Sequence, residues 1–458
     1  MYQIQFDHPV HIHFIGIGGI SMSGLAHVLL NAGFTISGSD SQMSDLTLEL
    51  ARQGARIRYG QSADNIEQDC DVVVYTAAIH PDNPEYAAAF SRGIPMLTRA
   101  QLLGQIMRNY AVPVAVAGTH GKTTATSMIS LMALSGNLDP TISVGGILKE
   151  IDGNIRVGNS DLFIAEACEY TNSFLSLFPK VSVILNIEAD HLDFFRDLKD
   201  IRSSFHRFAR LLPRDGALII HAGIDHLEEI TDQLTCRIIT YGIDSGDFQA
   251  GNITFDDHGC GSFDLLHNAQ SLGRFSLHVP GIHNISNALA SLACAHVLGI
   301  PEEACRQGLD AFHGADRRFE KKGTCQGAVI IDDYAHHPTE IKATLTASAH
   351  YPHRELWCVF QPHTYTRTKA LLEEFAQALT MCDHVILADI YAARETNTLG
   401  VSSAMIAERV RQLGTDAVYL GSFERIEQYL RANVHEDDLI ITMGAGNVYQ
   451  IGENLARS

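Results

Sequence analysis

The feature that most constrains the fold is the stretch AVPVAVAGTHGKTTATSMIS at residues 111–130. An apolar run leads into a loop made of Gly118, Thr119, His120, Gly121, Lys122, Thr123 and Thr124, and a helix-like pattern follows. A strand, a glycine-rich loop and a helix in this order form an anion site from backbone N–H groups. Lys122 adds a mobile cation for terminal phosphates, and Thr123 offers a hydroxyl to Mg²⁺.

This loop is shorter than the usual phosphate-binding loop. The usual form places four residues between its first glycine and the Gly-Lys pair. Here only two residues separate Gly118 from Gly121, and Val116 stands where the first glycine belongs. The alternative is a plain glycine turn, which the Gly-Lys-Thr-Thr sequence after an apolar strand disfavours.

Apolar runs alternate with helical patterns along most of the chain, which predicts α/β domains with mostly parallel sheets. A length of 458 residues favours three domains. We expect them at 1–108, 109–313 and 314–458. Strands are expected at 11–17, 34–40, 71–79, 112–117, 161–167, 181–187, 327–334, 355–361, 384–390, 416–421 and 438–444. Helices are expected at 20–33, 100–110 and 284–299, and the region 215–280 is expected to form a less regular sheet.

Composition limits the classes of partner and compartment. The formal net charge of −20 argues against nucleic acid as a main partner, because phosphate backbones require clustered Lys and Arg. Nine scattered cysteines without a C-x-x-C pair indicate a reducing, cytoplasmic compartment. No apolar run approaches the ~20 residues of a membrane helix, and no secretory signal is visible, so no membrane partner is expected.

Two acidic clusters follow strands of the second domain. EACEYTNSF contains Glu166 and Glu169, and NIEADHLDFF contains Glu188, Asp190, His191 and Asp193. Ligand groups collect at strand ends in open α/β sheets, and Mg²⁺ prefers oxygen ligands. Each cluster alone could equally be a solvated loop, but the phosphate loop in the same domain favours a metal site.

The first domain begins with GIGGISMSG, which resembles a dinucleotide fingerprint but has Ser21 at the third glycine position. Gly18 and Gly19 open the first helix, and Ser39 and Asp40 end the second strand, where a carboxylate could contact a ribose hydroxyl. These four residues predict a nucleotide or diphosphate site whose identity stays open. The alternative is a glycine turn needed only for packing.

Four polar motifs remain: PGIHNISNALA, GADRRFE, DDYAHHPTE and FQPHTYTRT. Asn284 or Asn287 could read a base edge, since an amide is both donor and acceptor. Arg317 or Arg318 could clamp phosphates with its planar fork. The pair His336 and His337 lacks a third ligand at metal spacing, so an orienting role is favoured over metal binding. Asp332 and Asp333 could instead cap the following helix.

These motifs in this order resemble the Mur ligases over essentially the whole chain. GTHGKTT is typical of the wider superfamily, whereas GIGGISMSG with DDYAHHPTE is more specific to members that add L-alanine. The resemblance implies a Rossmann-like N-terminal domain for a UDP-sugar, a central P-loop ATPase domain, and a Rossmann-like C-terminal domain for the amino acid. It implies a cytoplasmic ligase of peptidoglycan synthesis, monomeric or weakly dimeric, that uses ATP and Mg²⁺ to join L-alanine to UDP-N-acetylmuramate through an acyl phosphate.

The resemblance also implies residue roles. Lys122 would offset charge on the transferred phosphoryl group, Thr123 and Glu166 would hold one Mg²⁺, and His191 would hold a second. Asn284 and Asn287 would face the adenine, while Arg317 or Arg318 and Asp332 or Asp333 would close over the nucleotide. The residues expected at the bound substrates are Gly18, Gly19, Ser39, Asp40, Glu169, Tyr334, His336, His363 and Arg367. Among these, Arg367 would grip the alanine carboxylate, and His336 would also serve catalysis.

Two departures from the family pattern bear on the assignment. Several Mur ligases have a carbamylated lysine about fifteen residues after the histidine matched by His191, and here that region, RSSFHRF, has no Lys. The L-alanine-adding members also lack it. Other such members often read QPHRYTR, and here Thr364 stands at the Arg position, so one cation near the amino acid is missing.

Three other functions compete with this one. Another Mur-type amino-acid or peptide ligase would keep the same motifs with a different amino acid. A nicotinamide-dependent oxidoreductase would use the first domain and leave the Lys122 loop idle. A non-catalytic nucleotide sensor would keep the loop and leave the polar motifs of the third domain unexplained.

Overall fold

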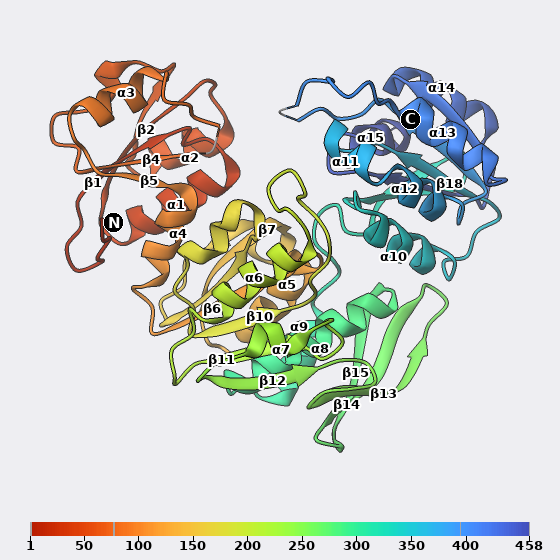
Figure 1. The fold of residues 1–458 in the computed structure, drawn as a ribbon, viewed down its shortest axis with the longest axis horizontal. Helices are drawn as coiled ribbons and strands as arrows, with labels where there is room; N and C mark the ends of the chain where they lie inside the picture. Colours follow the sequence, from red (N-terminus) through yellow and green to blue (C-terminus); the bar gives the residue numbers. More distant parts are fainter. Residues whose placement is uncertain (1, 77, 394, 458) are drawn as a thin grey trace. The chain divides into compact units, whose positions relative to one another are not determined.

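The computed structural model describes residues 2–76, 78–393 and 395–457. Three sheets carry the fold, as the alternation of strand and helix patterns predicts (Figure 1). Helices pack on mostly parallel strands in each of them, so the fold is three-domain α/β. No helix among the described residues is both long and apolar enough to cross a membrane.

The first sheet has five parallel strands in the order β3-β2-β1-β4-β5. The strand β1 is buried along its whole length because it lies at the centre of this sheet. The elements are β1 His11–Ile15, α1 Ile20–Asn31, β2 Thr35–Asp40, α2 Asp45–Arg52, β3 Arg56–Tyr59, β4 Val72–Tyr75, α3 Pro84–Ser91, β5 Met96–Thr98 and α4 Arg99–Met107. The expected strands at 11–17, 34–40 and 71–79 are confirmed, each somewhat shorter; β3 and β5 are additional.

The second sheet has ten strands in the order β15-β14-β13-β12-β11-β10-β6-β9-β7-β8. Its elements up to β10 are β6 Val112–Ala117, α5 Lys122–Ser135, β7 Thr141–Leu148, β8 Gly153–Arg156, β9 Leu162–Ala167 and β10 Val181–Ile184. They continue with α6 Leu198–Ala209, β11 Ala217–His221, α7 Leu227–Thr231, β12 Arg237–Tyr241, β13 Phe248–Phe255, β14 Cys260–His267, β15 Gln270–Pro280, α8 Ile282–Val297 and α9 Glu302–Asp310.

The central strands of this sheet explain where its polar loops gather. The strand β6 pairs in parallel with β9 on one side and with β10 on the other. Their carboxyl ends therefore meet at one edge, which brings the loop after Ala117, the carboxylates after β9 and the segment after β10 together. The expected irregular region is confirmed by the antiparallel pairing of β14 with β15.

The third sheet has the order β16-β17-β21-β18-β19-β20, with β16 antiparallel and the others parallel. Its elements are β16 Glu320–Cys325, β17 Ala328–Asp333, α10 Pro338–Ser348, β18 Leu356–Phe360, α11 Tyr365–Ala370, α12 Leu372–Leu379, β19 His384–Ala388, α13 Ser403–Gln412, β20 Asp416–Gly421, α14 Phe423–Asn433, β21 Leu439–Met443 and α15 Tyr449–Ala456. All five strands expected here are present.

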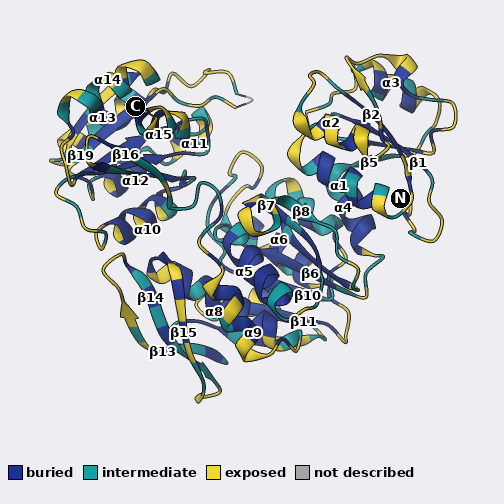
Figure 2. Cartoon of the chain, turned by 180° about the vertical axis from the view of Figure 1, so that it is seen from behind, coloured by how far each residue is buried: buried dark blue, intermediate teal, exposed yellow. Residues whose placement is uncertain are grey.

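Two apolar cores cover the two faces of this third sheet. The helices α10, α12 and α13 pack on one face, through residues such as Ile341, Phe375 and Ile406. The helices α14 and α15 pack on the other face, through Ile426 and Ile451 among others. The inner strands of this sheet are buried, and Figure 2 shows the helices as exposed on their outer sides. This is the layering that alternating strands and helices predict.

The chain divides into two compact units that do not follow the three sheets. One unit contains residues 1–188, 199–248 and 289–311, and the other contains 189–198, 249–288 and 312–458. Within the second unit, Phe255 of β13 stacks on His350 with ring centroids 5.8 Å apart, and His258 contacts Tyr351. These contacts explain why part of the expected second domain groups with the third.

Candidate active site

The loop between β6 and α5 has the backbone that the sequence predicts for an anion site. The helix α5 begins at Lys122, directly after Gly121, whose φ of +83° is unfavourable for residues with a side chain. Gly118 has φ +150°, and a Cβ there would lie 2.9 Å from the Cβ of Leu185. Both glycines are therefore required for the path of this loop.

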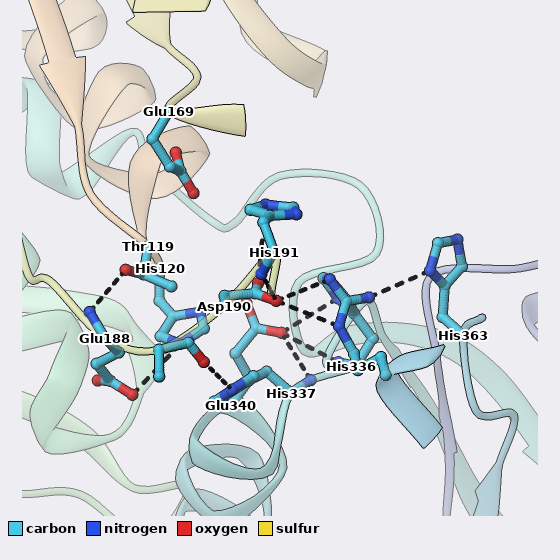
Figure 3. A network of polar contacts seen from close by, with 12 residues as sticks. Thr119, His120, Glu169, Glu188, Asp190, His191, His336, His337, Glu340 and His363 are labelled. Carbon is cyan, nitrogen blue, oxygen red and sulfur yellow. Dashed lines mark hydrogen bonds and ion pairs between the residues drawn. The ribbon is translucent and has the colours of Figure 1, made fainter. Parts of the chain in front are cut away.

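The segment after β10 holds the loop in place. The backbone N–H of His120 donates to Asn186 Oδ1 over 2.8 Å, and that of Thr119 donates to the Asn186 carbonyl over 3.2 Å. Thr119 accepts in turn, because the Glu188 N–H donates to its hydroxyl over 2.9 Å (Figure 3). The loop is thus preorganised by hydrogen bonds on the side facing β10.

Lys122 contacts three groups in this structure. Its Nζ donates to the carbonyls of Gly118 and Thr119, and lies 3.0 Å from Glu169 Oε2. Burial opposes the charged ammonium, but the neighbouring Glu169 carboxylate outweighs burial and raises the pKa of Lys122. The expected cation therefore lies in the loop, and its role toward a phosphate stays a prediction. Glu169, expected at the substrate, is buried and bound to this lysine.

Glu166 and Thr123 offer hard oxygen ligands within the same compact unit. Glu166 lies one residue before the end of β9, and a Cβ on Gly145 would collide with its carboxylate. A Cβ on the next residue, Gly146, would lie 3.3 Å from Thr123 Cγ2. Two glycines of β7 thus leave room beside both side chains. A carboxylate, a hydroxyl and phosphate oxygens are a donor set that suits Mg²⁺. Thr124 is mostly buried in the first turn of α5.

The glycine loop of the first sheet is closed by Asp40. The Gly18 N–H donates to Asp40 Oδ2 over 2.8 Å, and a Cβ on Gly18 would meet that same oxygen. The N–H groups of Gly16 and Ile17 both donate to the Ser39 carbonyl. Gly18, Gly19, Ser39 and Asp40 therefore lie together, as expected. The Ser39 side chain, however, is fully buried and donates to Glu85, so it supports this loop from inside the domain.

Arg317, one of the two expected phosphate clamps, has its donors engaged within the protein. Its Nε donates to Asp332 Oδ2 over 3.0 Å, and its two terminal nitrogens donate to the carbonyls of Gly444 and Gly446. Asp332 is fully buried and also accepts from Thr442. In this structure Arg317 connects the segment before β16 to the loop after β21, and Asp332 holds the Arg317 guanidinium.

Arg318 is the more accessible of the two arginines. Its Nη1 lies 3.8 Å from Glu340 Oε1, and its guanidinium lies over the Tyr334 ring at 5.2 Å. Asp333 accepts from the N–H groups of Phe319 and Ala335, and burial raises the pKa of this carboxyl to about 6. Asp333 thus shapes the turn that presents Arg318 and Tyr334.

The two asparagines expected at the adenine lie in the first turns of α8. Asn284 donates to the Pro280 carbonyl over 2.7 Å, and Asn287 donates to Asn284 Oδ1 over 3.2 Å. Both side chains are mostly buried. The structure brings them together with each other, and their role toward a base stays a prediction.

Arg367, expected to grip an amino-acid carboxylate, forms a shielded ion pair. Its Nη2 lies 2.9 Å and its Nε 3.3 Å from Asp190 Oδ1, and its Nη1 lies 3.2 Å from His363 Nδ1. Burial alone would raise the pKa of Asp190, but Arg367 and two histidines hold it well below its usual range. Burial first, then the charges on His336 and Arg367, lowers the pKa of His363 to about 4.

His336 and Tyr334 lie beside this pair at the carboxyl end of β17. The rings of His336 and His363 are 5.9 Å apart, and those of Tyr334 and His336 are 5.3 Å apart. His336 Nδ1 lies 3.0 Å from the Tyr334 carbonyl, which can only accept. Neutral His336 therefore carries its proton on Nδ1 and presents a lone pair on Nε2.

His191 adjoins Asp190 and has a strained backbone. Its φ is +53°, which is uncommon for a residue with a side chain, and its N–H donates to Asp190 Oδ1 over 2.7 Å. Figure 3 shows Asp190 and His191 with His336 and His363. All four residues belong to the second compact unit, whereas Lys122 and Glu166 belong to the first.

Sequence reasoning missed several residues that build these sites. Glu85, Tyr391 and the glycines 444 and 446 lie outside the motifs. Asn186 begins NIEADHLDFF and Gln361 lies in FQPHTYTRT, but neither was singled out. Gly444 and Gly446 are explained only by packing, since a Cβ on either would collide with Gln361.

Three consecutive parts of the chain match descriptions of one family. Residues 11–111 match the Mur ligase family, catalytic domain; residues 116–295 match the Mur ligase middle domain; and residues 317–446 match the Mur ligase, glutamate ligase domain. Together they cover most of the sequence, in the order that the motifs predict.

Similar proteins match the chain from end to end. A UDP-N-acetylmuramate–L-alanine ligase from Agathobacter rectalis is 60% identical over 458 residues, covering 100% of both chains. One from Lachnospira eligens is 55% identical over 459 residues, again covering 100% of both. The crystal structure of a UDP-N-acetylmuramate-alanine ligase from Thermotoga maritima superposes with a TM-score of 0.81 at 27% identity, covering 98% of each chain.

Proposed function

Because the chain belongs to the Mur ligase family, we infer that it is an ATP-dependent ligase that joins L-alanine to the lactyl carboxylate of UDP-N-acetylmuramate, in peptidoglycan precursor synthesis. The observation that carries this inference is the 60% identity to a named relative over the whole length. That identity spans both the phosphate loop and the cluster around Arg367.

The reaction proceeds in two transfers. A lactyl carboxylate oxygen attacks the γ-phosphorus of ATP, the bond to the β–γ bridging oxygen breaks, and ADP leaves behind an acyl phosphate. The amine of L-alanine then attacks the acyl carbon, and phosphate leaves from the tetrahedral intermediate. Catalysis of this kind depends on positioning and on offsetting phosphoryl charge.

The loop of the first unit supplies the charge for the first transfer. Lys122, already charged and held at the N-terminus of α5, offsets charge on the γ-phosphate together with the backbone N–H groups of residues 121–124. Thr123 and Glu166 would hold Mg²⁺, and His191 would hold a second ion. Mg²⁺ supplies Lewis-acid polarisation of the phosphate oxygens when bound.

The cluster of the second unit receives the amino acid. Arg367 would grip the alanine carboxylate through Nη1 and Nη2, which in this structure contact His363 Nδ1 and Asp190 Oδ1. The lone pair on His336 Nε2 accepts a proton from the alanine ammonium or from the amine after attack. Tyr334 and His363 border the same place. Arg318 is the better candidate for the nucleotide phosphates, since Arg317 has its donors engaged.

The remaining assignments are proposals of the same kind. The UDP-sugar diphosphate binds at Gly18 and Gly19, and Asn284 and Asn287 face the adenine. Domain boundaries lie near residues 108 and 313. The protein works in the cytoplasm as a monomer or weak homodimer, without nucleic acid or membrane.

Mass spectrometry of the reaction product tests the function. With ATP, Mg²⁺, UDP-N-acetylmuramate and L-alanine, we expect the UDP-sugar to gain the mass of one alanine residue, and omission of ATP to abolish this gain. Gain of a different amino acid from an equimolar mixture would instead support another Mur-type ligase.

A further inference from the structure

The loop after β19 is joined to the loop after β18 by hydrogen bonds at Tyr391 and Glu395. The Tyr391 N–H donates to the Pro362 carbonyl over 2.8 Å, and the Thr364 N–H donates to the Tyr391 carbonyl over 2.9 Å. Glu395 accepts from both the N–H and the hydroxyl of Thr366. These bonds fix the backbone of Tyr391 beside His363 on the neighbouring parallel strand.

The Tyr391 ring covers one face of the His363 imidazole. Their centroids are 5.6 Å apart with planes inclined by 17°, a stacked arrangement. A Cβ on Gly446 would lie 2.8 Å from Tyr391 Cδ2, so the backbone of Gly446 also lies against this ring. The ring is thus packed on His363 and Gly446 although Tyr391 is 39% exposed overall.

His363 in turn borders the guanidinium that is proposed to hold the amino acid. His363 Nδ1 accepts from Arg367 Nη1 over 3.2 Å, and its imidazole meets His336 edge to face at 5.9 Å. The imidazole is therefore in contact with Arg367, His336 and Tyr391. In the proposed function the amino acid binds between Arg367 and His336, so a longer side chain would press on His363, which the stacked tyrosine holds in place.

We propose that Tyr391 is a positioning residue that limits the size of the amino acid by holding His363 in place. This proposal rests on the proposed function, because it assumes that the amino acid binds between Arg367 and His336. Tyr391 does not contact the reacting atoms. It acts through His363, and its removal changes selectivity without removing the carboxylate grip.

The test compares kcat/KM for L-alanine with kcat/KM for L-2-aminobutyrate, which is one methylene longer. A methylene is discriminated by about 10- to 200-fold in an apolar site. In Tyr391→Ala we expect the preference for L-alanine to fall about tenfold, mainly through a lower KM for the longer amino acid. The KM values for ATP and UDP-N-acetylmuramate should stay within about twofold of wild type.

Two matched variants separate stacking from other effects. Tyr391→Phe keeps the ring and should keep the wild-type preference for L-alanine. If the hydroxyl were responsible, this variant would lose the preference. Tyr419→Ala removes a tyrosine of nearly equal exposure, 38%, from β20 of the same sheet and should leave the preference unchanged. Circular dichroism of each variant verifies that the fold is retained.

The outcomes distinguish this proposal from the proposed function. An unchanged preference in Tyr391→Ala, with wild-type protein active on L-alanine, would overturn the proposal and leave the function intact. Loss of preference in Tyr391→Phe would also overturn it. Wild-type protein that ligates no L-alanine would overturn the function itself.

Discussion

The side chain of Lys122 shows how a residue can be identified from the sequence while its contacts cannot. The Gly-Lys-Thr-Thr sequence identified it as the cation of the loop, but the ion pair with Glu169 joins residues 47 positions apart. The sequence identified Glu169 as a carboxylate near the end of a strand. Its contact with Lys122 follows from the parallel pairing of β6 with β9, which the sequence did not show.

We predict that Lys122→Ala lowers ATP-dependent phosphate release by at least about 100-fold. The variant removes the cation beside the transferred phosphoryl group, and loss of one preorganised donor typically costs 10²–10³ in rate. Phosphate release is measured with both substrates present. Lys180→Ala, which removes a surface lysine paired with Asp215, is the control and should retain wild-type activity. Activity retained in Lys122→Ala would remove the loop from catalysis.

Asp190 provides a second prediction at this scale. Asp190→Asn weakens the ion pair that orients Arg367, so the KM for L-alanine should rise about tenfold or more, as for a lost charge-assisted bond of roughly 1.5–3 kcal/mol. The KM values for ATP and UDP-N-acetylmuramate should change little. A variant with unaltered KM for L-alanine would show that Arg367 does not need this partner.

The lowered pKa of His363 predicts a pH effect on stability. The folded protein keeps this imidazole neutral down to about pH 4, whereas the unfolded chain binds a proton near pH 6.5. The contribution of neutral His363 to the stability of the fold is therefore complete above pH 6.5 and is lost as the pH falls from 6.5 toward 4. Urea unfolding gives the free energy of unfolding at pH 7.5 and at pH 5.5. Between these two pH values, this free energy should decrease less in His363→Asn than in wild type. Equal losses in the two proteins would contradict the assignment.

At the scale of elements, the first sheet is joined to α3 by a buried carboxylate. Glu85 is fully buried and accepts from Ser39, Asn65, His13 and the Ser62 N–H. The Ser39 carbonyl also accepts hydrogen bonds from the N–H groups of Gly16 and Ile17. Glu85 therefore stabilises the glycine loop through Ser39. No sequence motif indicates this role of Glu85, because a single Glu after Pro84 is typical of the first turn of any helix.

We predict that Glu85→Leu destabilises the protein by about 3–5 kcal/mol, the usual cost of removing one partner from a buried charged network. His13, Ser39 and Asn65 would lose their shared acceptor. Urea unfolding measures the change. Glu49→Leu on the exposed side of α2 is the control and should change stability by less than about 0.5 kcal/mol. A similarly small effect of Glu85→Leu would contradict the importance of the network.

The elements themselves were largely predictable. Strands with continuous apolar runs, such as β6 and β18, are buried on both faces and could be identified from sequence alone. The edge strand β3, with the sequence RIRY, is mostly exposed and lacks that signal. The antiparallel strand β16, EKKGTC, is likewise polar because it lies at the sheet edge.

At the scale of the whole molecule, sequence order predicted three α/β domains but not their grouping. The segment 189–198 lies within the expected second domain, yet it belongs to the compact unit of the third sheet. In this segment Asp190 forms an ion pair with Arg367, which is 177 positions away in the sequence. A local sequence pattern cannot predict a contact between residues so far apart. The motifs predicted which residues form the sites, and only the structure showed the contacts of these residues.

The central claim is the identity of the amino acid, and a substrate panel tests it most directly. Phosphate release is recorded with ATP, Mg²⁺ and UDP-N-acetylmuramate while L-alanine, glycine, L-serine, D-glutamate and diaminopimelate are supplied one at a time. We predict the highest kcat/KM with L-alanine, slow turnover with glycine and L-serine, and none with D-glutamate or diaminopimelate. A preference for D-glutamate or diaminopimelate would contradict the claim.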